Sequence, residues 1–157
     1  MRAVLQRVSE ASVTVNGAQI SRIGRGICVL LGISVDDTEK DIDYIVKKIL
    51  NVRVFESGEG EERRMWQRSV KDLGLEIMCV SQFTLWGQTT KGNKPDFHLA
   101  MKSEQARAMY ETFKKKLGEA YDPTKIKDGE FGAMMEVHIV NSGPVTLQIS
   151  SSNDKTT

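Results

Sequence analysis

The sequence predicts a single α/β domain, built from β-strands and two helices. Alternating apolar and polar residues over 2–15 and again over 135–149 indicate strands with one buried face. Largely apolar runs over 27–33 and 75–80 indicate central strands that are covered on both faces. The 157 residues are enough for one domain with a substantial core. We assign that domain to residues 1–150 and expect a polar, disordered tail over 151–157.

Composition excludes several classes of protein. Apolar residues make up 39% of the chain, charged residues 27%, and the formal net charge is +1, so any contact with RNA must come from local basic clusters. Cys28 and Cys79 lie in apolar strands and are expected to be buried thiols of a reducing compartment. No apolar stretch is long enough to span a membrane. We therefore expect a cytoplasmic protein without a membrane partner.

Residues 2–33 predict a hairpin followed by a central strand. Asn16-Gly17 is a strong turn signal because both residues accept the positive φ angles of a tight hairpin. Arg7 is unusual, since it shares its strand face with Ala3 and Leu5. Without further information, we interpret Arg7 as a sheet-edge arginine whose head group reaches solvent.

The first helix is predicted to follow Thr38, which forms a capping box with Asp41. A short strand is predicted over 52–55, followed by a charged loop over 56–64. The apolar stripe of the helix, at i, i+3, i+4 and i+7 spacing, consists of Ile42, Ile45, Val46, Ile49 and Leu50.

The strand over 75–80 continues into Ser81-Gln82-Phe83-Thr84-Leu85, which has two interpretations. In the first, it is a half-exposed strand in which Gln82 and Thr84 face water while Phe83 and Leu85 pack. In the second, it is a functional cluster, because buried polar side chains need partners. The basic loop over 91–98 that follows is either a phosphate-binding loop or a solvated connector.

A second helix is predicted with Ser103 as its cap and with an inner stripe that includes Ala106 and Tyr110, and it ends before Pro123. The segment 141–146, Asn-Ser-Gly-Pro-Val-Thr, then separates two alternating runs. Proline has no N–H for a sheet ladder, so the Gly143-Pro144 step is predicted to end one strand and begin the next as a hairpin turn. An X-Pro bond is also the one peptide bond that adopts the cis form at modest cost.

The inventory of reactive residues excludes the common hydrolytic sites. His98 and His138 are the only histidines, no Cys/His cluster has zinc spacing, and no nucleophile elbow or P-loop is present. We expect neither a metal nor a cofactor. A hydrolase of this sequence would have to use backbone dipoles, hydroxyls or the substrate itself.

The segments 81–85 and 141–146 together resemble the paired signature of D-aminoacyl-tRNA deacylases. The opening residues 1–8, the loop over 91–97 and the chain length match that family as well. The resemblance implies a homodimeric three-layer β/β/α sandwich, with mixed, largely antiparallel sheets and two covering helices. The implied activity is chiral proofreading in translation: hydrolysis of the ester of D-aminoacyl-tRNA, and of mischarged glycyl-tRNA, to free tRNA and amino acid.

The resemblance also implies the roles of individual residues. The catalytic site would combine Ser81, Gln82, Phe83 and Thr84 of one subunit with a cis Gly143-Pro144 step of the other, which rejects L-aminoacyl-tRNA. Arg7 would hold the Gly-Pro loop in place. The pocket for the terminal adenosine of the tRNA would be lined by Ala106, Phe131 and Met135.

Rigid main-chain atoms suit such a selection, because an enzyme that accepts many D side chains must sense the geometry at Cα and collide with the L arrangement. Two mechanisms for ester cleavage remain open. Thr84 is a covalent nucleophile in the first, although no base is visible beside it. Water attacks in the second, assisted by the ribose 2′-OH and by backbone N–H groups near Phe83 and Thr84. We favour the second.

Two other classes of function remain open. One is a nucleic-acid-binding module without hydrolysis, supported by Lys91, Lys94 and the lysines over 114–116. The other is a structural or regulatory dimer, in which the polar strand end at 81–84 would have no purpose.

Overall fold

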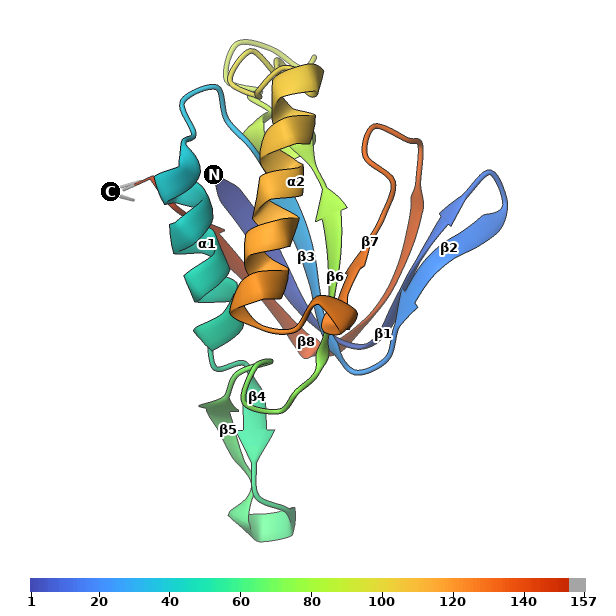
Figure 1. Ribbon diagram of the computed structural model, residues 1–157, viewed down its shortest axis with the longest axis vertical. Coiled ribbons are helices and arrows are strands. Elements are labelled where there is room, and N and C mark those ends of the chain that lie inside the picture. Colours follow the sequence, from blue (N-terminus) through green and yellow to red (C-terminus); the bar gives the residue numbers. More distant parts are fainter. Residues whose placement is uncertain (153–157) are drawn as a thin grey trace.

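The computed structural model describes residues 1–152 of the chain (Figure 1). It is a mixed α/β structure with two α-helices, so the predicted fold class is confirmed at that level. In chain order the elements are β1 (Arg2–Val15), β2 (Ala18–Ile23), β3 (Gly26–Gly32), α1 (Glu39–Asn51), β4 (Phe55–Ser57), η1 (Gly60–Glu62), β5 (Arg64–Arg68), β6 (Glu76–Ser81), η2 (Phe83–Trp86), α2 (Ser103–Ala120), η3 (Pro123–Lys125), β7 (Ile126–Asp128) and β8 (Glu136–Ser150).

The long strand β1 organises the main sheet, in which the strand order is β2-β1-β3-β6-β7 and β8 also pairs with β1. β1 is antiparallel to β2, β3 and β8, whereas β3, β6 and β7 are parallel to one another. The predicted hairpin is confirmed, with φ angles of 50° at Asn16 and 78° at Gly17. The mixed pairing places the carboxyl ends of β3 and β6 at the same edge of the sheet.

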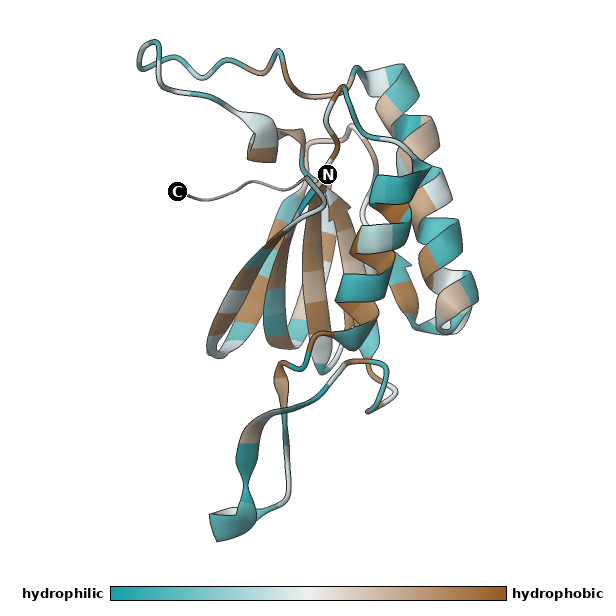
Figure 2. Ribbon diagram, turned by 90° about the vertical axis from the view of Figure 1, so that its left-hand side faces the viewer, coloured by the Kyte–Doolittle hydropathy of each residue, from teal (hydrophilic) through white to brown (hydrophobic). Residues whose placement is uncertain are grey.

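Both helices pack on one face of this sheet (Figures 1 and 2). Leu5 of β1 and Ile77 of β6 share a core cluster with Ile45 of α1 and Phe113 of α2. A second cluster lies on the opposite face of the strands, around Val13 and Met78. Each fully buried aliphatic side chain contributes roughly 1.5–3 kcal/mol relative to an exposed one, so the helices are held mainly by these stripes.

The predicted first helix is confirmed, including its capping box, in which a carboxylate oxygen of Asp41 accepts the backbone N–H of Thr38 at 2.8 Å. The predicted second helix is confirmed, but the prediction that Ser103 caps it is wrong, because Ser103 is its first residue and Lys102 occupies the cap position. Pro123 follows the end of α2 as expected and opens η3.

The predicted hairpin turn at 141–146 is wrong, because β8 is one strand that runs along β1 on both sides of this segment. Thr146 pairs with Gln6 and Asn141 with Val8, so four residues of β8 lie opposite Arg7 alone. We call these residues, 142–145, the Gly-Pro bulge. The Asn141 side chain closes the bulge by accepting the Val145 N–H at 3.0 Å, and the Gly143-Pro144 peptide bond within it is cis.

Other boundaries also differ from the prediction. The short strand lies at Phe55–Ser57 rather than 52–55, and it pairs with β5, which the charged loop concealed. Residues 55–68 thus form a protruding arm (Figure 1). β7, which pairs with β6 in parallel, was not predicted either. These strands are short and rich in charge, so their periodicity is weak.

Met1 and Ser151 lie side by side. The backbone N–H of Ser151 donates to the Met1 carbonyl at 2.9 Å, and the Ser151 hydroxyl donates to Asp41 at 2.7 Å. Of the tail expected over 151–157, residues 153–157 lie outside the described residues.

Candidate functional site

A pocket of about 620 Å³ opens at the edge of the sheet where β3 and β6 end. Its walls come from the end of β6, the start of η2, the first turns of α2 and the segment 131–135. Six of the predicted site residues meet there: Ser81, Gln82, Phe83, Ala106, Phe131 and Met135. Segments between Leu31 and Val137 that are far apart in the sequence therefore form one cavity, which we call the site pocket.

The polar wall of the site pocket is a turn of backbone. β6 ends at Ser81, and the N–H of Gln82 then donates to the Leu31 carbonyl at 2.8 Å. The next four residues form η2, whose first N–H groups, those of Phe83 and Thr84, have no hydrogen-bond acceptor among residues 1–152. Free N–H groups are a general property of a helix start, and they can receive an anionic oxygen.

The interpretation of 81–85 as a half-exposed strand is wrong. The Phe83 side chain is 56% exposed and meets Phe97 edge to face, with ring centroids 5.1 Å apart. Thr84 is exposed and does not line the pocket, but its hydroxyl oxygen accepts the Gln82 side-chain amide. Gln82 therefore connects Thr84 to the pocket.

The apolar wall is formed around Phe131. Its ring centroid lies 5.7 Å from that of Tyr110, and the Arg107 guanidinium lies 4.7 Å from the Phe131 centroid. Ala106 of α2 also lines the cavity and has a small side chain. An aromatic ring in the lining offers a surface on which another ring can pack.

A polar network that the sequence did not reveal supports this wall. The Tyr110 hydroxyl donates to Asp128 at 2.6 Å, and Lys114 donates to the second carboxylate oxygen of Asp128 at 2.5 Å. Burial raises the pKa of Tyr110, and the nearby Asp128 charge acts in the same direction, so the phenol remains a donor. Tyr110 was expected only as a core residue, and no periodicity connects it with Asp128.

The remaining predicted residues lie in a second region, around the Gly-Pro bulge. Arg7 is 7% exposed, so its interpretation as a solvent-reaching arginine is wrong. Its Nε donates to the Ser142 carbonyl at 3.0 Å, and its Nη1 donates to the Val54 carbonyl at 2.9 Å. The side chain points to the helix-covered face and fastens the bulge to the base of the arm.

Within one chain the two regions do not meet. Arg7 pairs with Ile27, which pairs with Ile77 near the start of β6, whereas the site pocket begins three residues later at Val80. At about 3.3 Å per residue this separation is roughly 10 Å along the sheet. Gly143 and Pro144 do not line the site pocket.

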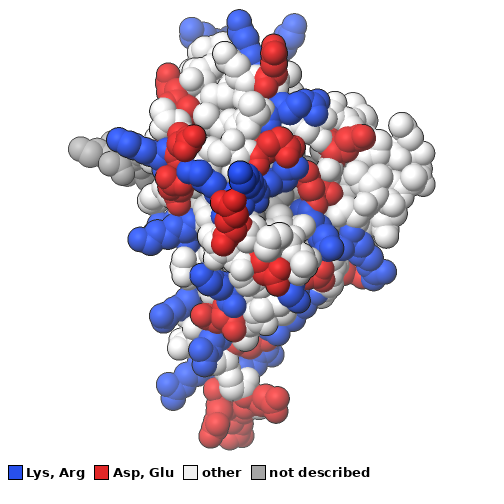
Figure 3. Space-filling view, in the orientation of Figure 1, with Lys and Arg blue, Asp and Glu red and all other residues white. Residues whose placement is uncertain are grey.

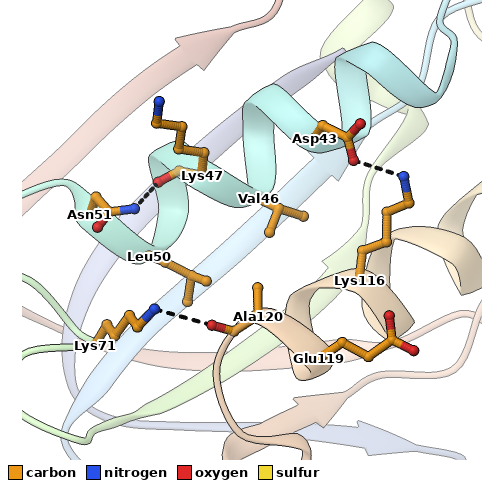
Figure 4. A pocket seen from close by; sticks show the side chains of 9 residues that line it. All are labelled: Asp43, Val46, Lys47, Leu50, Asn51, Lys71, Lys116, Glu119 and Ala120. Carbon is orange, nitrogen blue, oxygen red and sulfur yellow. Dashed lines mark hydrogen bonds and ion pairs between the residues drawn. The ribbon is translucent and has the colours of Figure 1, made fainter.

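A second hollow lies between α1 and α2 and contains none of the predicted site residues (Figure 4). Lys116 crosses it to Asp43 at 2.7 Å, and Lys71 donates to the Ala120 carbonyl at the end of α2 at 3.2 Å. The first contact joins the two helices, and the second joins the end of α2 to the turn after β5, which accounts for the hollow structurally.

Within residues 1–152, no three His, Cys, Asp or Glu side chains cluster as a metal site would require. Across the same residues, neither helix is long and apolar enough to cross a membrane.

Comparison with known proteins gives consistent matches. A sequence model of the family described as D-Tyr-tRNA(Tyr) deacylase matches residues 4–150. A D-aminoacyl-tRNA deacylase of Drosophila melanogaster is 57% identical over all of this chain and 96% of its own length. D-aminoacyl-tRNA deacylase 1 of Homo sapiens is 59% identical over 96% of this chain and 70% of its own length.

Two solved structures are also similar. One, named "c-Myc DNA Unwinding Element Binding Protein", is 59% identical with a TM-score of 0.89, over 97% of this chain and 99% of that one. The other, named "Structural Analysis of a probable eukaryotic D-amino acid tRNA deacylase", is 20% identical with a TM-score of 0.78, over 94% of this chain and 97% of that one. At that identity the second likeness concerns the fold alone.

Proposed function

The chain belongs to the D-Tyr-tRNA(Tyr) deacylase family, and from this premise we propose that it acts as a D-aminoacyl-tRNA deacylase. It is a hydrolase that cleaves the ester between a D-amino acid and the terminal ribose of tRNA. The observation that carries the proposal is the site pocket, which brings the start of η2, with its free backbone N–H groups, and the Phe131 ring to one cavity. No cofactor is required by the chemistry proposed below.

The apolar wall suits the terminal adenosine of the tRNA. The base would stack on Phe131, with Ala106 and Met135 closing the sides of the cavity. Stacking of a base on an aromatic ring contributes about 1–3 kcal/mol and tolerates any base. The Tyr110 and Arg107 contacts hold the Phe131 ring before the substrate arrives, which reduces the entropy lost on binding.

For the cleavage step, a water molecule adds to the ester carbonyl, and the acyl–oxygen bond breaks to give the free acid and the ribose hydroxyl. The N–H groups of Phe83 and Thr84 would receive the oxyanion, and the adjacent ribose 2′-OH would assist the proton transfer. A covalent role for Thr84 is less favoured, because its oxygen accepts a hydrogen bond from Gln82 and no base lies beside it.

Selection between D and L substrates would require a second copy of the chain. The Gly-Pro bulge lies outside the pocket of its own chain, so we propose a homodimer in which Gly143 and Pro144 of one subunit enter the pocket of the other. In this arrangement the dimer is a three-layer β/β/α sandwich. Arg7 holds the bulge, and main-chain atoms collide with an L side chain, whereas glycyl-tRNA, which lacks a side chain, is accepted.

A nucleic-acid-binding module without hydrolysis is the second candidate. It is favoured by the solved structure at 59% identity, whose name describes DNA binding. Two lysines that could support it are engaged, since Lys114 pairs with Asp128 and Lys116 pairs with Asp43. On the face shown in Figure 3, basic and acidic side chains are intermixed. Lys91 and Lys94 are exposed and remain compatible with either candidate.

The decisive experiment measures the release of amino acid from D- and L-aminoacyl-tRNA. Under this proposal, the protein acts on these substrates in the cytoplasm. We expect D esters to be cleaved and L esters to be spared by a factor above the roughly 200-fold that a single methylene supplies. Tight binding of tRNA with equal inertness toward both esters would favour the second candidate.

A further inference from the structure

Glu56, at the base of the arm, lies among three arginines. Its Oε1 is 3.0 Å from Arg25 and 3.2 Å from Arg63, and its Oε2 is 3.8 Å from Arg7. Arg25 precedes β3, Arg63 belongs to the arm, and Arg7 belongs to β1. One carboxylate therefore contacts three parts of the chain, and one of its partners, Arg7, also holds the Gly-Pro bulge.

Arg7 differs from the other two arginines of this cluster because its charged group is buried. The Arg25 and Arg63 side chains are 48% and 55% exposed, whereas that of Arg7 is 8% exposed. A buried guanidinium is unfavourable without a counter-charge. Among residues 1–152, the one carboxylate within 4 Å of Arg7 is that of Glu56.

Glu56 is ionised at neutral pH. Its pKa lies below the ordinary value because its own backbone N–H donates to the carboxylate, and the charges of Arg25, Arg63 and Arg7 act in the same direction. Without this negative charge, the three guanidinium groups would repel one another. The buried Arg7 would then have no counter-charge to stabilise the position in which it donates to the Ser142 carbonyl.

We propose that Glu56 is a positioning residue for substrate selection: it holds Arg7 in place, and through Arg7 it sets the position of the Gly-Pro bulge. This inference rests on the proposed function, because the bulge must select the substrate. Glu56 itself does not touch the substrate. Its loss is therefore expected to relax the rejection of L-aminoacyl-tRNA more than it slows D-aminoacyl-tRNA.

The test compares Glu56→Gln with wild type in hydrolysis of D- and L-aminoacyl-tRNA, well below the melting temperature of each protein. We expect the ratio of D to L rates to fall about tenfold, the size of effect typical of a residue that acts through another. Glu56→Asp keeps the charge and should restore most of the ratio. Glu61→Gln makes the same charge change on the exposed arm and should leave the ratio unchanged.

A double variant makes the electrostatic cause specific. In the Glu56→Gln background, Arg63→Gln removes one of the competing cations, so the ratio should partly recover. If Arg7→Lys lowers the ratio but Glu56→Gln does not, the inference is overturned and the proposed function stands. If wild type cleaves both mirror-image substrates alike, the proposed function fails, and this inference with it.

Discussion

The site pocket and the Gly-Pro bulge are built in opposite ways. The pocket is lined by side chains from distant parts of the chain, such as Phe83, Ala106 and Phe131, around a cavity of about 620 Å³. The bulge is a loop of main chain held by one buried side chain, Arg7, whose partners are carbonyl oxygens. The first region offers shape and stacking, and the second offers atoms whose positions do not depend on rotamers.

Under the proposed function, this difference indicates how two tasks are divided. Binding the same adenosine suits side chains, because a pocket of aromatic and aliphatic groups can adjust to one fixed ligand. Rejecting one hand of the substrate while accepting many side chains suits the rigid main chain of the bulge. Because the Gly-Pro bulge lies about 10 Å along the sheet from the pocket of its own chain, the proposed site would combine parts of two chains.

Gly143→Ala should produce the largest effect, because it changes the Gly-Pro bulge itself. A Cβ there would lie 2.9 Å from Val145 and 3.0 Å from Arg7, and φ at this position is +128°. A misplaced Gly-Pro bulge is expected to slow D-aminoacyl-tRNA hydrolysis by about 100-fold or more. The measurement is kcat/KM on D-aminoacyl-tRNA, with the melting temperature recorded alongside.

Gly17→Ala is the matched control. Gly17 also has a positive φ, +78°, but its added Cβ would meet nothing within 4 Å. It should lose about 1 kcal/mol of stability with kcat/KM unchanged. Equal losses of activity in both variants would mean that Gly143 matters only for folding.

Mixing two inactive variants should sharpen the comparison further. Ala106→Phe fills the pocket, whereas Gly143→Ala spoils the bulge, so a mixed dimer contains one site in which both parts are intact. Co-expression with two affinity tags allows the mixed dimer to be purified through both tags. One of its two sites is intact, so it should show about half of the wild-type activity per dimer. Activity no higher than the sum of the two homodimers would contradict a shared site.

Phe131→Ala should have a smaller effect that is confined to the pocket. Loss of the stacking surface is expected to raise KM for D-aminoacyl-tRNA by about tenfold, while the ratio of D to L rates stays the same. Phe131→Tyr keeps the ring and should bind nearly as wild type. A changed D to L ratio in Phe131→Ala would show that the pocket also senses handedness.

The sequence was sufficient for the elements whose burial is periodic. Both α-helices, the first hairpin and the strands β3 and β6 were predicted because their apolar residues repeat at regular intervals. The predicted residues of the apolar wall also meet in one pocket, although their roles were implied by a family resemblance rather than by spacing.

What the sequence could not predict depends on long-range contacts. Glycine and proline at 143–144 signal a break in a strand, and only the pairing of β8 with β1 on both sides shows a bulge instead of a turn. Arg7 has the pattern of an edge residue because its partners, the Ser142 and Val54 carbonyls, are main-chain atoms far along the chain. The same reason conceals the link between Tyr110 and Asp128.

Thr84→Ala should have the smallest effect, and it separates the two mechanisms of cleavage. Thr84 is exposed, and its hydroxyl oxygen is occupied by the Gln82 amide, so its removal leaves the backbone N–H groups of η2 in place. If water attacks and those groups hold the oxyanion, kcat should change by only about twofold, far less than the roughly 100-fold that loss of one oxyanion donor produces. Retention of most activity, with no acyl-enzyme detectable by mass spectrometry in wild type, would exclude a covalent threonine. A trapped acyl group on Thr84 would show that a side chain attacks the ester, and it would contradict a mechanism that depends on water and backbone N–H groups.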